Sequence, residues 1–337
     1  MKLHENKELF KDAIIATSQL KNVAKIYVEK DYWVTLALHF IFSNEIGKSC
    51  IFKGGTALSK CNHLIDRFSE DIDIVLLKQG NESSNQLKNK LNKITTIVGE
   101  YIPEIEIEGI TNKKGMIRKT AHNYKKIFEG LFGQIRDKLI VEATCLGSFE
   151  PFEKGKVSSF IYEMIIETNQ QQIADEYGLN PFELNVLSPK RTFCEKIMSL
   201  VRFSHTINPI EDLNNKVRHI YDINQMLKNE EITKFFNSTE FDKLLVIVAN
   251  DDLLSFKSGN EWLQNHPTQA MIFKESADVW DKLKTTYFST FSKLVYGDLP
   301  TENEILETLN KLSERMKNID WKVKLRPHNK NNNPRNP

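Results

Sequence analysis

A glycine pair between two apolar runs restricts the fold of this chain more than any other feature. Residues 50–52 are apolar and predict the end of a buried strand, which the pair Gly54-Gly55 then interrupts. Residues 72–77 form a second apolar run, preceded by Asp71 and containing Asp73. The pattern predicts a strand, a tight turn, a short helix and a second strand that carries two acids at its start.

The two acids predict a metal site. Residues i and i+2 of a strand face the same side, so Asp71 and Asp73 should point together beside the glycine turn. Two adjacent carboxylates repel each other unless a cation lies between them, and Mg²⁺ is usually held by one or two carboxylates together with substrate phosphates. Thr56 stands where a helix N-cap is expected, and the turn can offer backbone N–H groups to those phosphates. We therefore predict a metal-dependent site for nucleotidyl transfer.

The amino-acid composition excludes few classes of function. The 337-residue chain has a formal net charge of +1, so an interaction with nucleic acid must be argued from local patches. The cysteines are scattered, which indicates buried thiols in a reducing compartment rather than a disulfide framework or a zinc site. The N-terminus lacks the apolar core of a signal peptide, and no apolar run approaches the roughly 18 residues of a membrane span. We expect a soluble, cytoplasmic protein with no membrane partner.

A third acid lies in the middle of another predicted strand, at residues 137–146. An acid at such a position is rarely buried without a partner, so Glu142 is a candidate third metal carboxylate. The alternative is an acid on an edge strand, paired with Lys138 or Arg118.

A helix predicted over residues 25–44 contains charged residues directly followed by two large aromatic residues. In one interpretation Tyr32 and Trp33 pack under the sheet while Lys30 and Asp31 reach solvent. In the other, one of these two charged residues supports the site around the glycine turn.

Residues 112–126 carry five lysines and Arg118, interleaved with His122 and Tyr124, and contain no acid. Basic residues among aromatics suit RNA or a polyphosphate. The alternative is a solvated hairpin.

The remaining patterns indicate an α+β fold. Residues 104–110 and 157–167 read as strands, whereas residues 230–254, 275–295 and 301–318 have the spacing of amphipathic helices. We expect a mixed, partly antiparallel sheet flanked by helices, followed by a helical bundle.

Five sequence blocks, taken in order, resemble one protein family. They are Glu29-Lys-Asp-Tyr-Trp33, Phe52-Lys-Gly-Gly-Thr-Ala-Leu58, Arg67-Phe-Ser-Glu-Asp-Ile-Asp73, Glu195-Lys196 and Arg218-His-Ile-Tyr-Asp222. Their order is similar to that of the AbiEii/AbiGii toxin family, within the DNA polymerase β-like nucleotidyltransferase superfamily. The resemblance implies a nucleotidyltransferase domain at residues 1–200 and a helical bundle domain at residues 201–321. Residues 322–337 are polar and interrupted by prolines, which predicts a disordered tail.

The resemblance also implies roles for the acids. Asp71 and Asp73 match the metal-binding pair of the superfamily. Glu142 and Asp222 compete for the role of third acid, since Glu142 lies on the expected strand and Asp222 matches the acid of the last block. The alternative for Asp222 is an ion pair with Arg218 one helical turn earlier, worth about 0.3–0.5 kcal/mol.

Nucleotide contacts are expected from the glycine turn and from nearby lysines. Lys196 matches a helix lysine thought to contact nucleotide phosphates in these toxins, and Thr56 stands where the wider superfamily has serine. The nucleotide-binding candidates are Lys53, Gly54, Gly55, Thr56, Ser59, Lys60 and Lys196. The expected cofactor is Mg²⁺, as two ions, and the substrate is an NTP.

The expected activity is transfer of a nucleoside monophosphate from an NTP to RNA. The resemblance implies a tRNA acceptor and a role as the toxin of a toxin–antitoxin or phage-defence pair, with a protein antitoxin as partner. An alternative acceptor is a small molecule such as an aminoglycoside, or a protein hydroxyl group. A third alternative is a non-catalytic RNA-binding scaffold, which the intact pair of aspartates argues against.

Overall fold

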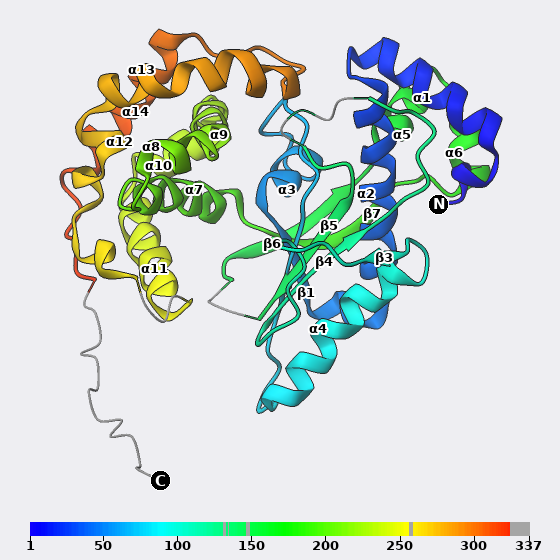
Figure 1. The fold of residues 1–337 in the computed structure, drawn as a ribbon, viewed down its shortest axis with the longest axis horizontal. Helices are drawn as coiled ribbons and strands as arrows, with labels where there is room; N and C mark the ends of the chain where they lie inside the picture. Colours follow the sequence, from blue (N-terminus) through cyan, green and yellow to red (C-terminus); the bar gives the residue numbers. More distant parts are fainter. Residues whose placement is uncertain (131–132, 134, 146–148, 256–258, 324–337) are drawn as a thin grey trace.

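A seven-stranded mixed sheet forms the centre of the N-terminal part of the chain in a computed structural model (Figure 1). The structure describes residues 1–130, 133, 135–145, 149–255 and 259–323. The strand order is β3-β4-β5-β2-β1-β7-β6. The strands are β1 (Cys50–Lys53), β2 (Ile72–Leu76), β3 (Glu104–Ile105), β4 (Ile117–His122), β5 (Leu139–Thr144), β6 (Phe152–Val157) and β7 (Phe182–Leu187).

The pairing of the strands confirms the mixed, partly antiparallel sheet. Strand β1 runs antiparallel to β2 and parallel to β7, and β2 runs parallel to β5. The remaining neighbours, β3 with β4, β4 with β5, and β6 with β7, are antiparallel. As a result β1 and β7 end at the same edge of the sheet at which β2 and β5 begin.

The two faces of the sheet differ in chemistry because side chains alternate along a strand. Ile72, Ile74 and Leu76 of β2 belong to the main hydrophobic core, on the face that helices α2 (Lys25–Ser43) and α4 (Ser84–Gly99) cover. Val75 belongs instead to a small separate cluster on the opposite face. Asp73 shares that opposite face, so the polar site is built on the side away from the main core.

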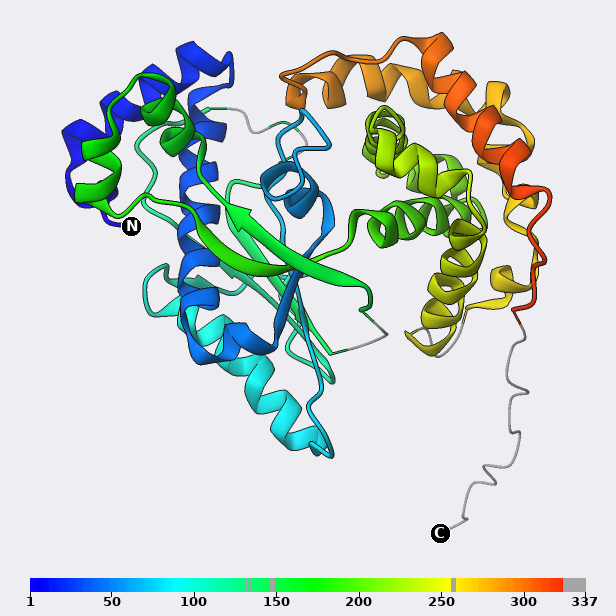
Figure 2. The same cartoon turned by 180° about the vertical axis from the view of Figure 1, so that it is seen from behind.

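The helices form two groups on either side of α3 (Gly54–Lys60), as the two opposite views show (Figures 1 and 2). One group lies with the sheet and the other forms the C-terminal body. No helix in the described residues is both long and apolar enough to cross a membrane. The first group is α1 (Lys7–Lys21), α2, α4, α5 (Phe160–Glu167) and α6 (Gln171–Tyr177). The second is α7 (Pro189–Phe203), α8 (Pro209–Asn214), α9 (Val217–Leu227), α10 (Glu230–Phe236), α11 (Thr239–Ser255), α12 (Met271–Lys274), α13 (Ser276–Thr286) and α14 (Glu302–Met316).

Two strand predictions need correction. Residues 157–167 are not a strand, because β6 ends at Val157 and Ser159 caps α5 by accepting a hydrogen bond from the N–H of Tyr162. The strand predicted at residues 104–110 stops after Ile105, and the chain then turns through Gly109, whose φ is +76°.

The expected division at residue 200 falls inside α7, which packs against α9 and α11 of the C-terminal body. We propose the start of α7 as the division instead. Residues 324–337 of the expected tail lie outside the described residues, while Val323 is buried against the core.

Candidate active site

A row of four charged residues crosses the sheet at the edge where β1 ends and β2 begins. Lys53 of β1 pairs in register with Asp73 of β2, and Asp73 pairs with Glu142 of β5. Glu142 in turn pairs with Lys119 of β4, and the Lys119 Nζ donates to Glu142 Oε2 over 2.7 Å. The register therefore places two carboxylates side by side between two lysines. Glu142 lies on a central strand, so its predicted alternative as an edge-strand acid is wrong.

The glycine turn is required by the position of Asp73. Gly54 has a φ of +86°, in the left-handed region that favours glycine, and a Cβ atom there would lie 2.5 Å from Asp73 Oδ2. A Cβ on Gly55 would lie 2.7 Å from Arg67 Nη2 and 2.9 Å from Ser69 Oγ. The two glycines thus let the start of α3 approach the acids of β2.

Thr56 does not cap α3, which begins at Gly54. Its buried hydroxyl group donates instead to Ser69 Oγ over 3.0 Å. The effect of Thr56 on the cavity therefore passes through Ser69, whose side chain lines it.

The electrostatics around Asp73 favour a bound cation. Burial raises the pKa of Asp73 to about 7, and the charges of Asp71 and Glu142 add to this effect, while Lys53 and Lys119 oppose it. The ionised form of the carboxyl group is therefore disfavoured until further positive charge arrives.

The residues present fit a magnesium ion held in part by substrate. Asp71 Oδ1 is buried and accepts no hydrogen bond from the described residues, and Arg136 Nη1 stands 3.6 Å away. The described residues contain no ready-made cluster of three metal-binding side chains. Asp71 and Asp73 would thus hold Mg²⁺ together with phosphate oxygens, as is usual for this ion.

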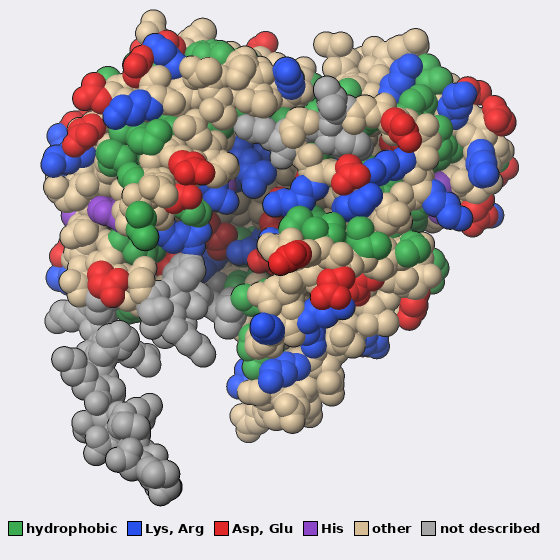
Figure 3. Space-filling model, viewed as in Figure 1, with side chains coloured by type: hydrophobic (Ala, Val, Ile, Leu, Met, Phe, Trp, Pro, Cys, Tyr) green, Lys and Arg blue, Asp and Glu red, His purple; other side chains and the backbone are tan. Residues whose placement is uncertain are grey.

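A cavity of about 460 Å³ separates the acids from the C-terminal helices, within the range of about 300–1,000 Å³ for small-molecule sites. Nine cationic and six acidic side chains line it, so an excess of positive charge faces its interior. Lys and Arg side chains gather in and around this hollow (Figure 3). Its helical wall includes Lys196, Arg202, Lys216 and Arg218. The arrangement suits a polyanion that also needs a metal.

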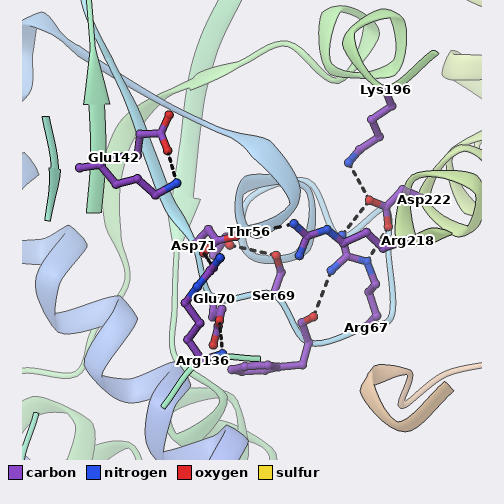
Figure 4. Close-up of polar contacts among 12 residues, drawn as sticks. Thr56, Arg67, Ser69, Glu70, Asp71, Arg136, Glu142, Lys196, Arg218 and Asp222 are labelled. Carbon is purple, nitrogen blue, oxygen red and sulfur yellow. Dashed lines mark hydrogen bonds and ion pairs between the residues drawn. The ribbon is translucent and has the colours of Figure 1, made fainter. Parts of the chain in front are cut away.

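Asp222 is buried behind the wall and does not line the cavity. It accepts hydrogen bonds from Arg67 Nε over 2.6 Å, from Arg67 Nη2 over 2.7 Å and from Lys196 Nζ over 2.6 Å (Figure 4). Although burial alone would raise it, Arg67 and Lys196 hold the pKa of Asp222 down at about 2. The carboxylate therefore fixes two cations in place.

Glu142 lines the cavity beside Asp73, whereas Asp222 does not line it. The geometry therefore favours Glu142 over Asp222 as the third acid. The predicted alternative, an ion pair between Asp222 and Arg218, is also wrong. Arg218 Nη2 points instead toward Asp71 Oδ2, 3.9 Å away.

Two nucleotide-binding candidates lie away from the cavity. Lys60, at the end of α3, pairs with Asp31 at 2.5 Å and donates to the carbonyl oxygen of Ser158 over 3.0 Å. Ser59 lies 3.4 Å from the hydroxyl group of Tyr296. Neither lines the cavity, whereas Lys53, Gly54, Gly55 and Lys196 do.

The charged residues of α2 support the site, which confirms the second interpretation of this helix. Glu29 accepts hydrogen bonds from the N–H groups of Ile127 and Phe128, at 2.6 and 3.0 Å. Lys30 pairs with Glu70, next to Asp71, and Asp31 pairs with Lys60. The expectation that Lys30 and Asp31 reach solvent is wrong, because both are buried.

Several lining residues were not predicted. Arg191, Glu195, Ser199 and Arg202 face the cavity from one side of α7. Their spacing, with that of Lys196, is the spacing of one helical face, and this signal could have found them. His219 also lines the cavity, and burial, with the neighbouring cations, holds its pKa well below the ordinary value.

Comparisons with known proteins identify a family and a solved structure that this chain resembles. A sequence model described as the nucleotidyl transferase AbiEii toxin of type IV toxin–antitoxin systems matches residues 39–325. That range contains four of the five blocks, and the block at residues 29–33 precedes it. Among solved structures, MenT4, a nucleotidyltransferase toxin from Mycobacterium tuberculosis, matches with 16% sequence identity and a TM-score of 0.39, over 89% of this chain and 98% of that chain. A comparison with curated protein sequences gives no match.

Proposed function

Because the chain belongs to the AbiEii family of nucleotidyl transferase toxins of type IV toxin–antitoxin systems, we propose that it moves a nucleoside monophosphate from an NTP to a tRNA hydroxyl group. The proposed reaction depends on Mg²⁺ and takes place in the cytoplasm, where both substrates are found. A protein antitoxin is the proposed partner that counteracts it.

One observation carries the proposal. The half-buried acids Asp71 and Asp73 face a cationic helical wall across a cavity of suitable size for a nucleotide. An NTP has the matching distribution of charge, since its triphosphate can contact the wall while its α-phosphate lies near the acids. Mg²⁺, when bound, would neutralise the acids and lower the pKa of the attacking hydroxyl group.

The residues of the chain bind and orient the reactants. In the proposed reaction the acceptor oxygen attacks the α-phosphorus, the bond from that phosphorus to the β-phosphate oxygen breaks, and pyrophosphate leaves. Lys196 and Arg218 place positive charge where the leaving pyrophosphate gains negative charge, which lowers the barrier. Asp222 positions Lys196 for this role. The acceptor hydroxyl group releases its proton to solvent water as it attacks, and the negative charge of Asp71, Asp73 and Glu142 favours that release.

The test uses purified protein, Mg²⁺, unfractionated tRNA and each labelled NTP in turn. We expect label in the RNA with the wild-type protein, and a loss of more than about 10²-fold in the variants Asp71→Asn and Asp73→Asn. A circular dichroism spectrum like that of the wild type shows that each variant is folded. Label in the protein alone, or in an added aminoglycoside alone, would contradict the RNA acceptor. Tight RNA binding without label would contradict catalysis.

A further inference from the structure

A patch of basic residues lies beside the acids, on the side of the cavity opposite the helical wall. We call Lys125, Lys126, Arg136 and Lys138 the basic ridge. The register of β4 and β5 ends with His122 opposite Leu139, so residues just after β4 and just before β5 meet at one edge of the sheet. The parallel pairing of Ile72 with Val141 brings Asp71 to the same edge. The basic ridge therefore adjoins the metal-binding acids.

Arg136 has a fixed backbone and an exposed side chain. Its N–H group donates to Glu70 Oε1 over 2.9 Å, and its carbonyl oxygen accepts a hydrogen bond from Lys30. Lys30 and Glu70 form a buried ion pair, so both anchoring groups are themselves held inside the protein. The side chain is 47% exposed, and its guanidinium group reaches to 3.6 Å from Asp71 (Figure 4). A rigid backbone thus presents a solvent-accessible cation at the point where an acceptor must approach the acids.

The rest of the basic ridge extends this positive charge away from the cavity. Lys126 and Lys138 share one acid, Asp137, at 2.7 and 3.1 Å. Lys125 is exposed. Asp137 directly follows Arg136, whose side chain reaches toward Asp71, so the ridge begins close to the mouth of the site. Lys126 and Lys138 exceed the single charge of Asp137, and with Arg136 and the exposed Lys125 they give the ridge a net positive charge.

The charged groups around the acids thus divide into two sets. The helical wall, with Lys196 and Arg218, faces the interior of the cavity, where a triphosphate fits. The basic ridge begins with Arg136 at the lining of the cavity and continues outside it with Lys126 and Lys138, where a chain of phosphates could lie along it. We propose that the basic ridge binds the sugar–phosphate backbone of the acceptor RNA strand, with Arg136 contacting the phosphate nearest the reacting hydroxyl group. This inference rests on the proposed function and adds to it the surface that holds the acceptor.

The test compares Arg136→Gln, the double variant Lys126→Gln/Lys138→Gln and a control, Lys234→Gln. The anchoring of Arg136 uses backbone atoms, so replacement of its side chain leaves the Lys30 and Glu70 contacts in place. Lys234 pairs with Glu230 on the surface of α10 and does not line the cavity. Steady-state transfer rates are measured with the concentration of unfractionated tRNA varied at saturating NTP, and then with the concentration of NTP varied at saturating tRNA. The affinity for tRNA is measured separately, from about 50 to about 200 mM salt.

We expect the KM for tRNA to rise in both ridge variants and the KM for NTP to stay within about twofold of the wild type. Each lost phosphate contact lowers the slope of log affinity against log salt by about 0.7 for a single strand. The ratio of wild-type to variant affinity should then change by about 2.6-fold per contact over this salt range. Lys234→Gln should match the wild type in every measurement.

Two outcomes would overturn the inference. One is an unchanged KM for tRNA with an unchanged salt slope, as expected if the ridge docks an acidic protein instead. The other is a rise in the KM for NTP equal to that for tRNA, which would assign Arg136 to the nucleotide. In both cases the wild-type protein still labels tRNA, whereas absence of label with the wild type would refute the proposed function itself.

Discussion

Asp73 and Asp222 offer a sharp test of the division between metal-binding and positioning acids. Asp222 is buried and Asp73 is half-buried, and both should be needed for transfer, but their surroundings are opposite. Asp222 compensates two buried cations, Arg67 and Lys196. Asp73 stands beside two other acids, Asp71 and Glu142. Replacement by asparagine therefore predicts stability changes of opposite sign.

For Asp222→Asn the expected loss is large. Removal of one partner from a buried ion pair costs about 3–5 kcal/mol, because the remaining charge stays buried without compensation. Unfolding of 337 residues at about 2.1 cal/mol/K per residue carries an entropy of about 0.7 kcal/mol/K. The Tm should therefore fall by about 4–7 °C. For Asp73→Asn the repulsion from its neighbours disappears, so the Tm without metal at about pH 8 should rise.

Differential scanning calorimetry in EDTA measures both changes, and NMP transfer below both melting temperatures measures activity. Both variants should lose transfer activity. Asp73→Asn loses a metal ligand, whereas Asp222→Asn loses the carboxylate that holds Lys196 in place. A Tm for Asp222→Asn equal to that of the wild type, or a fall in Tm for Asp73→Asn of similar size, would refute the assignment of roles.

Three further predictions concern stability and nucleotide binding. In urea denaturation, the free energy of unfolding of Asp73→Asn should exceed that of the wild type by a margin that grows as pH rises from about 4 to about 7. The Asp73 carboxyl group has a pKa of about 7 in the folded protein, so it keeps a proton in this range that the unfolded chain has released, and the wild type loses stability. A difference that stays constant with pH would contradict this prediction. Gly54→Ala should lose transfer and about 1–3 kcal/mol of stability, since its φ is +86° and the new Cβ would meet Asp73, whereas Gly99→Ala, with open space around it, should behave as the wild type. Lys60→Met should lower the free energy of unfolding by about 3–5 kcal/mol, because it breaks the ion pair with Asp31. At a temperature low enough to keep the variant folded, its KM for NTP should equal that of the wild type, and a raised KM would show that Lys60 contacts the nucleotide.

The acids and the glycine turn could be predicted from the sequence because each depends on residues within a few positions of one another. The glycine pair, the aspartates of β2 and the mid-strand Glu142 are each recognisable from spacing within one strand or turn. The register confirms that Asp73 and Glu142 are neighbours, although β2 and β5 are far apart in sequence.

The sequence could not predict partners that only tertiary packing selects. Lys60 is close to the glycine turn in sequence, but one and a half turns of helix point it toward Asp31 on the other side. Lys119 and Arg136 approach the acids through strand pairing and a loop contact, and neither follows a local pattern. The strand predicted at residues 157–167 failed because Asp31, a distant residue, accepts the N–H of Phe160 at the start of α5.

The contacts of α2 have a consequence for synthesis of the protein. Glu29, Lys30 and Asp31 leave the ribosome before every segment that they hold, and Lys196 and Asp222 leave it much later. At about 5–20 residues per second, the roughly 150 residues between Asp73 and Asp222 take on the order of ten seconds to translate. Throughout that interval the acids exist without the cationic wall. A chain that terminates before Asp222, or that has not yet been translated to that point, therefore has no complete site with which to harm the cell that makes it.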